Sequence, residues 1–189
     1  MLLWGYLVYL FGIWTTFRYF SHLPVAIEEL WFKPMLWLVP ILWINLYGKI
    51  RIIYFGGRWF RAALWGLAVG SFYMLAILGL TDREIGWNWN NIGVGIVTSI
   101  TENTVFMGFV LQTLSRSTTS GKAIGMTAVL FSLIHLPIAL LIYHLSWQSM
   151  AGLMMLTLVQ AVVGGWLMKR TGNIIAPIVA SAMWMIAAI

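Results

Sequence analysis

The chain has 189 residues, of which 61% are hydrophobic and only 8% are charged. A water-soluble domain carries about 25% charged residues, so this composition excludes a soluble globular protein and predicts a protein embedded in a membrane. The formal net charge of +6 is therefore assigned to loops facing anionic lipid headgroups rather than to nucleic acid, and the absence of cysteine excludes disulfides and cysteine metal sites.

Seven apolar segments follow one another along the chain, joined by short connections. A helix of ~20 apolar residues crosses the hydrocarbon core of a bilayer, so we predict an all-α, polytopic transmembrane helical bundle forming a single domain over residues 1–189. The N-terminal MLLWGYLVYL has no basic stretch or cleavage pattern, and we expect a retained span. The predicted spans are Leu2–Tyr19, Leu30–Tyr47, Arg61–Leu80, Ile92–Leu114, Lys122–Tyr143, Ser146–Met168 and Asn173–Ile189.

The basic residues are distributed unevenly over the connections. Connections rich in Lys and Arg stay on the cytoplasmic side of a membrane. We therefore expect the N-terminus, and the second, fourth and sixth connections, on the cytoplasmic side of the cell (inner) membrane. Eight of the eleven basic residues lie in or beside these three connections: Lys49, Arg51, Arg58, Arg61, Arg116, Lys122, Lys169 and Arg170.

The third span contains a GxxxG pattern, formed by Gly66 and Gly70. Small residues one helical turn apart let the backbone of a second helix approach closely. The pattern predicts close helix packing at this position without identifying the partner helix.

Two ionisable residues, Glu102 and His135, lie deep inside predicted spans. An ionisable group in hydrocarbon costs at least ~2.5–3.5 kcal/mol and therefore faces a partner inside the bundle. Because the fourth and fifth spans are antiparallel neighbours, we predict that these two side chains face each other. Such a pair could activate a water molecule, or it could only lock two helices together. The other acidic residues are expected in loops: Glu28, Glu29, Asp82 and Glu84.

Three stretches resemble the motif regions of the CPBP family, the CAAX-protease and bacteriocin-processing membrane proteins also called ABI proteins. They are TENTVFMGFVLQTL, AVLFSLIHLP and MKRTGNIIAPIVASAMWMIA. The family patterns are EExxxR, FxxxH and HxxxN, and the resemblance covers about residues 95–189. It implies an intramembrane glutamate protease fold, in which the first Glu and the second-motif His activate water while the third-motif His and Asn bind the oxyanion.

The first two motifs match this family in part. Glu102 stands at the first Glu, and Phe131 and His135 satisfy FxxxH, whereas Asn103 and Met107 replace the second Glu and the Arg. Removing one member of a buried ion pair costs ~3–5 kcal/mol, because the other charge is left unpaired. The two charges are missing together here, so we expect that no stranded charge remains.

The third motif has lost both of its expected donors. Ser181 replaces the His and Met185 replaces the Asn; a hydroxyl can still donate one hydrogen bond, whereas a thioether cannot. The resemblance therefore implies Glu102, His135 and Ser181 as candidate catalytic residues, with Asn103 as a possible supporting donor. We expect the first three to converge on one interior cavity.

A second stretch, EELWFK from Glu28 to Lys33, also echoes EExxxR. It lies in the first connection and lacks the glycine that follows the family motif. We interpret it as a coincidence of charges at the membrane interface.

The incomplete motifs favour a catalytically impaired member of the family, a pseudoenzyme that binds a transmembrane or lipidated protein partner or serves as a subunit of a membrane complex. An active intramembrane endopeptidase, with water activated by Glu102 and His135, is the alternative, and a transporter or pigment-binding protein is a third possibility. No cofactor is expected. Glu102, His135 and Ser181 are not a usual zinc ligand set, so no metal is expected either.

Overall fold

The computed structural model describes residues 2–21, 23–48, 56–80 and 89–188. These residues form helices and turns, and no strand occurs among them. Four of the charged residues named above lie outside the described ranges: Lys49, Arg51, Asp82 and Glu84.

The helices follow the predicted apolar segments. Five helical stretches are long and apolar enough to cross a membrane: Glu28–Tyr47, Trp59–Gly79, Trp89–Leu114, Ser120–Leu141 and Trp147–Thr171. The all-α transmembrane bundle is confirmed, although the first and last predicted spans are not among these five, because one is rich in Trp and Tyr and the other is short. The elements are α1 (Leu2–Phe20), α2 (Val25–Ile27), η1 (Glu28–Phe32), α3 (Lys33–Gly48), α4 (Trp59–Leu80), α5 (Trp89–Asn103), η2 (Thr104–Val110), α6 (Leu111–Leu114), α7 (Ser120–Leu133), α8 (Leu136–Leu141), α9 (Trp147–Thr171) and α10 (Ile175–Ala188), with η marking π-helix.

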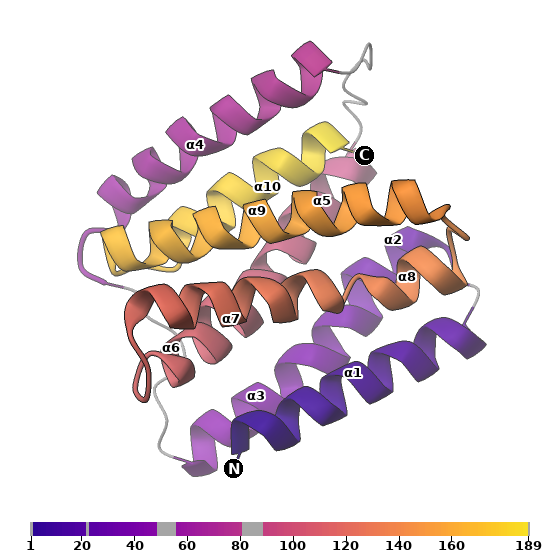
Figure 1. Cartoon of the computed structure of the whole chain (residues 1–189). Coiled ribbons are helices and arrows are strands. Elements are labelled where there is room, and N and C mark those ends of the chain that lie inside the picture. The colour runs from indigo at the N-terminus through magenta and orange to yellow at the C-terminus, as the bar shows by residue number, and fades with distance from the viewer. Residues whose placement is uncertain (1, 22, 49–55, 81–88, 189) are drawn as a thin grey trace.

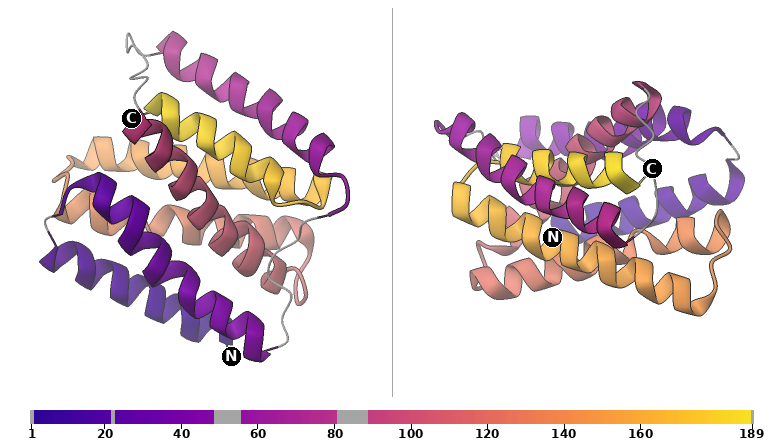
Figure 2. Two further views of the ribbon diagram at one scale, coloured as in Figure 1. Left: turned by 180° about the vertical axis from the view of Figure 1, so that it is seen from behind. Right: turned by 90° about the horizontal axis from the view of Figure 1, so that it is seen from above.

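The helices form two layers (Figures 1 and 2). In one layer α3, α5, α10 and α4 lie side by side in that order, and in the other α1 contacts α8, while α7 and α8 contact α9. Contacts of α9 with α10 and of α1 with α3 join the layers. Of the motif-bearing helices, α5 contacts α10 within one layer, and α7 of the other layer contacts η2, the continuation of α5.

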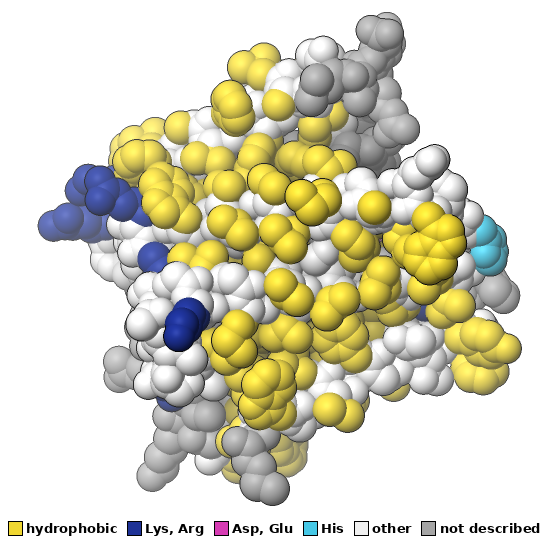
Figure 3. Space-filling view, viewed as in Figure 1, with side chains coloured by type: hydrophobic (Ala, Val, Ile, Leu, Met, Phe, Trp, Pro, Cys, Tyr) yellow, Lys and Arg dark blue, Asp and Glu magenta, His cyan; other side chains and the backbone are white. Residues whose placement is uncertain are grey.

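The helical stretch Trp89–Leu114 lies at the centre of the bundle. Over its 18-residue apolar window, 78% of the residues are buried inside the protein, whereas the share in the same window of the other four candidate spans is between 17% and 39%. The outer helices present large apolar side chains to their surroundings, as the space-filling view shows (Figure 3). A surface of this kind requires lipid rather than water.

The GxxxG pattern of α4 packs against α10 of the same chain. A Cβ atom on Gly66 would lie 2.6 Å from the carbonyl oxygen of Ala176, and one on Gly70 would lie 2.7 Å from Sδ of Met183. At contacts this short a side chain would force its neighbours to move, so the predicted close approach is confirmed and its partner helix is α10.

Candidate functional site

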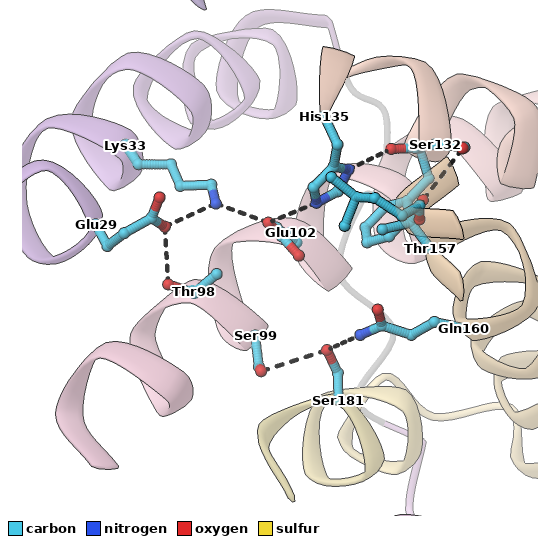
Figure 4. Close-up of polar contacts among 12 residues, drawn as sticks. Glu29, Lys33, Thr98, Ser99, Glu102, Ser132, His135, Thr157, Gln160 and Ser181 are labelled. Carbon is cyan, nitrogen blue, oxygen red and sulfur yellow. Dashed lines mark hydrogen bonds and ion pairs between the residues drawn. The ribbon is translucent and has the colours of Figure 1, made fainter. Parts of the chain in front are cut away.

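Glu102 lies near the end of α5 and is fully buried. Its Oε1 atom is 2.7 Å from Nζ of Lys33 and 3.7 Å from Nε2 of His135 (Figure 4). The two side chains predicted to face each other, Glu102 and His135, do meet inside the bundle. The cation beside them, Lys33, was not predicted to belong to this site.

His135 lies where the fifth predicted span breaks into α7 and α8. Pro137 at the start of α8 has no N–H group to continue the preceding helix. The imidazole Nδ1 lies 2.8 Å from the carbonyl oxygen of Phe131. Because that oxygen can only accept, Nδ1 carries the hydrogen and donates it. Nε2 is then the ring nitrogen that faces the carboxylate of Glu102.

The distance between Nε2 and the Glu102 oxygen, 3.7 Å, is too long for a direct hydrogen bond. In a neutral imidazole Nε2 is an acceptor, as is the carboxylate oxygen. A water molecule could donate one hydrogen to each of the two and leave its own lone pairs free. The alternative is a proton on Nε2, which would make the pair an ion pair.

Lys33 joins Glu102 to a second carboxylate. Its ammonium group is 2.7 Å from Oε2 of Glu29 and 2.7 Å from Oε1 of Glu102, and the side chain is buried. Thr98, one helical turn before Glu102 on α5, donates a hydrogen bond of 2.9 Å to the same oxygen of Glu29. Residues of η1, α3 and α5 are thereby connected in one polar chain.

Arg18 of α1 extends this cluster. It forms ion pairs with Glu28 and, at 2.9 Å, with Glu29, and its side chain is 1% exposed. Its guanidinium carbon lies 4.4 Å from the ring centroid of Trp14, in the range of a cation–π contact. The guanidinium group therefore has carboxylates at its edge and an aromatic ring on its face.

The interpretation of EELWFK as interfacial charge is wrong, as is the placement of Glu28 and Glu29 in a loop. Both acids lie in the π-helix η1 and are buried. They turn inward because Arg18 and Lys33 supply two buried cations, and buried charges require such partners. The detectable signal was Lys33 itself, a charged residue inside the predicted span Leu30–Tyr47.

The expectation that no stranded charge remains holds for Glu102, but for a reason other than the one expected. Glu102 has no cation at Met107, which is buried against apolar neighbours, yet the carboxylate is paired because Lys33 reaches it from α3. The cluster has three carboxylates and two cations and is formally one unit negative when the imidazole is neutral: Glu28, Glu29 and Glu102 against Arg18 and Lys33. A proton on the imidazole of His135 would balance this charge.

Both parts of the cluster adjoin π-helical turns. Glu28 and Glu29 lie within η1, and Glu102 lies two residues before η2. A π-helix accommodates an extra residue per turn and is found frequently at functional sites. The local change in helical phase helps both elements point polar side chains into an interior that is otherwise apolar.

A cavity of about 170 Å³ adjoins this cluster. An empty cavity of ~150 Å³ in another protein holds benzene, so the space suffices for one side chain or a small group. Charged residues, aromatic residues and one methionine of α10 are among its lining: Arg18, Glu29, Lys33, Glu102, His135, Trp14, Trp37, Tyr143 and Met185.

Ser181 does not line this cavity. Its hydroxyl accepts a hydrogen bond of 2.9 Å from Nε2 of Gln160 and lies 3.3 Å from the donating hydroxyl of Ser99. Asn103 donates to the carbonyl oxygen of Ser99 at 2.8 Å, and both Asn103 and Ser181 line a separate, much smaller cavity. The expected convergence of Ser181 with Glu102 and His135 is therefore absent, because Ser181 bonds to α9 while Met185, one turn later, reaches the larger cavity.

The described part of the chain contains no group of three or more His, Cys, Asp or Glu side chains that could hold a metal ion. The cation beside Glu102 is the ammonium group of Lys33. The arrangement can thus neutralise a carboxylate, hold a polar group in an apolar interior and position a water molecule.

A family model described as type II CAAX prenyl endopeptidase Rce1-like covers residues 84–187, more than half of the chain. No curated protein and no solved structure gives a significant match. The matched range includes Glu102, His135 and Ser181, whereas Glu29 and Lys33 precede it. This chain is an integral membrane protein and belongs to the Rce1-like family of type II CAAX prenyl endopeptidases, within the CPBP proteins.

Proposed function

We propose that this protein is a catalytically impaired member of its family that binds a transmembrane or lipidated protein segment in the Glu102 cavity. The observation that carries this proposal is the ion pair between Lys33 and Glu102. The carboxylate oxygen that faces His135 already accepts from the ammonium group at 2.7 Å. A catalytic water must compete with this cation for the same oxygen.

The wall of the cavity formed by α10 supports the same proposal. Met185 lines the cavity there, and its thioether cannot donate a hydrogen bond to an oxyanion. Loss of a single oxyanion donor typically lowers the rate ~10²–10³-fold. Ser181, the remaining hydroxyl of this motif, is engaged with Gln160 next to the other cavity.

A bound peptide segment fits the unused polar atoms of the cavity residues. Nε of Arg18 and Nε1 of Trp37 are buried donors, and Oε2 of Glu102 is a buried acceptor, without a hydrogen-bond partner in the described part of the chain. A peptide group offers one acceptor and one donor, which complement such atoms. The aromatic rings of Trp14 and Trp37 give the cavity an apolar wall for a side chain or lipid.

An active peptidase is the second candidate, and the orientation of His135 favours it. The bond from Nδ1 to Phe131 directs Nε2 toward Glu102, and a water held between the two would present its lone pairs to a substrate carbonyl. In this case the ammonium of Lys33 would stabilise developing negative charge. Glu102 and His135 would then be catalytic residues.

Cleavage and binding can be measured separately to distinguish the two candidates. The native chain and Glu102→Gln are reconstituted in vesicles with a fluorescent, prenylated peptide. Under the proposal both proteins bind the peptide, and neither cleaves it above the rate of empty vesicles. Lys122→Gln, a change outside the cavity, is the control. Cleavage by the native chain that Glu102→Gln abolishes would establish the peptidase, and failure of the native chain to bind any lipidated or transmembrane peptide would overturn the binding role.

We further propose that the N-terminus and the basic end of the bundle face the cytoplasm. The Lys and Arg side chains visible in Figure 3 gather at the end where α9 ends and α7 begins. Excess Lys and Arg mark the cytoplasmic side. Because the sequence has no cysteine, Thr118→Cys gives a single label site, which an impermeant reagent should reach only after the membrane is opened. Labelling of intact cells at the same rate would reverse the orientation.

A further inference from the structure

Three arginines converge on a pocket at the basic end of the bundle, between the start of α4 and the end of α9. The pocket has a volume of about 200 Å³ and is lined by Arg58, Arg61, Arg170, Ala62, Trp65 and Thr171. No acidic residue is among these, and none of the three arginines forms an ion pair with a residue that the structure describes. Three like charges around one concavity repel each other unless an anion lies between them.

The walls of this pocket are fixed to each other. Asn173, just after α9, donates a hydrogen bond of 2.8 Å to the carbonyl oxygen of Gly56, which precedes α4. A Cβ atom on Gly56 would lie 2.9 Å from the carbonyl oxygen of Gly172. Gly172 ends α9 with a φ of 63°, a conformation that favours glycine. The positions of Arg58 and Arg170 are therefore set by packed backbone.

We propose that this pocket binds the phosphate headgroup of an anionic membrane lipid. The planar guanidinium group of arginine matches phosphate oxygens in pairs of parallel hydrogen bonds. Basic pockets between helix ends at a membrane surface are suited to lipid headgroups. A general excess of positive charge on one side of the membrane explains why these residues lie at this end, but not why three of them line one pocket.

The surroundings of the pocket favour a lipid over a soluble phosphate. Trp59, Phe60 and Trp166 lie on the two helices that form the pocket and are 62%, 63% and 44% exposed. Aromatic side chains at the membrane interface lie beside headgroups and upper acyl chains. A headgroup in the pocket would place its chains along these rings. This site lies apart from the Glu102 cavity and does not depend on the function proposed for it.

The test compares two triple variants that each lose three positive charges. Arg58→Gln/Arg61→Gln/Arg170→Gln removes the lining, whereas Arg116→Gln/Lys122→Gln/Lys169→Gln removes basic residues at the same end that do not line the pocket. Purified proteins in nanodiscs of phosphatidylcholine are titrated with phosphatidylglycerol, and bound lipid is counted by native mass spectrometry. The pocket variant should lose affinity about fivefold for each arginine, on the order of 100-fold in total. The control variant should lose about twofold or less.

If the two triple variants lost equal affinity for phosphatidylglycerol, the lipid would be held by general electrostatic attraction, and the proposed pocket site would be wrong. Equal retention of phosphatidylcholine and phosphatidylglycerol by the native protein would overturn the preference for an anionic headgroup. In a separate arm, inorganic phosphate is added to the native protein, once without and once with the anionic lipid. If it raises the melting temperature of the native protein as much as phosphatidylglycerol does, and displaces that lipid, the ligand is a soluble phosphate and the lipid proposal is wrong.

Discussion

The two halves of this protein differ in the motifs that their sequences contain, yet both contribute residues to the same site. Residues 84–187 match the family and contain Glu102 and His135, whereas residues 2–80 carry no complete motif. Yet the cation bound to Glu102 is Lys33 from the unmatched half. The site therefore belongs to both halves, and the charge balance of the matched half cannot be judged from its own residues.

The carboxylate of Glu102 is paired although the arginine of the family motif is absent at Met107. A carboxylate in an apolar interior requires a cation, whichever helix supplies it. Here the ammonium of Lys33 is shared by Glu29 and Glu102, and Arg18 holds Glu29 from the other side. Loss of Lys33 would leave Glu102 without a cation, whereas Glu29 would keep its ion pair with Arg18.

Lys33→Met should therefore cause a large loss of stability. It leaves the carboxylates of Glu29 and Glu102 without their shared cation, and breaking a buried pair costs about 3–5 kcal/mol. The free energy of unfolding in detergent measures the effect. Lys122→Met, which removes an exposed lysine, should change it by about 0.5 kcal/mol or less.

A double variant makes this prediction specific to the ion pair. Lys33→Met/Glu102→Gln also removes the carboxylate that Lys33→Met leaves without a cation, so part of the lost stability should return, with a coupling energy of about 0.5–3 kcal/mol. If Lys33→Met is as harmless as Lys122→Met, then the cluster does not join the two halves energetically.

The site was predictable in part, and the missing part has a physical reason. The depth of Glu102 and His135 in adjacent spans was enough to predict that they meet, because an ionisable group in hydrocarbon seeks a partner. Lys33 alone is an ambiguous signal, because a lysine near a span end can extend its ammonium to the interface. Glu29, four residues earlier and able to pair with it on a helix face, argued for a buried pair instead.

The fold was more predictable than the site because span length and apolar composition are local properties. The positions of the helices along the chain could be predicted from these properties, whereas the helix that packs against each of them could not. Gly66 indicated a close helix contact, but its partner α10 lies more than a hundred residues away. The position of Ser181 likewise depended on Gln160 of α9, a polar residue in a span that no motif had marked.

Gly66→Ala tests how closely the two halves must pack. The added methyl group would lie 2.6 Å from a backbone oxygen of Ala176, so α4 must move away from α10. Overpacking of this kind costs about 1–3 kcal/mol, measured as the free energy of unfolding in detergent. Gly79→Ala in the same helix is the matched control, because no atom lies within 4 Å of its added Cβ. It should be neutral or slightly stabilising, and equal destabilisation by both changes would contradict the packing argument.

Ser181→Ala should lower the free energy of unfolding by less than Lys33→Met or Gly66→Ala does. It tests whether the two cavities within the matched half are separate. The change leaves the donors of Gln160 and Ser99 without their shared acceptor, at a cost of about 1 kcal/mol in the free energy of unfolding. Ser99→Ala touches the same network, so the two changes together should cost less than their sum.

The binding of a prenylated peptide distinguishes this structural role from a role in the site. Ser181 lies outside the cavity that Glu102 and His135 line, so Ser181→Ala should leave peptide affinity within about twofold of the native value. His135→Ala, which removes a side chain of the cavity wall, should lower it. If Ser181→Ala weakens peptide binding as much as His135→Ala does, the two cavities act as one site. Ser181 would then be a residue of that site, as the family resemblance implied.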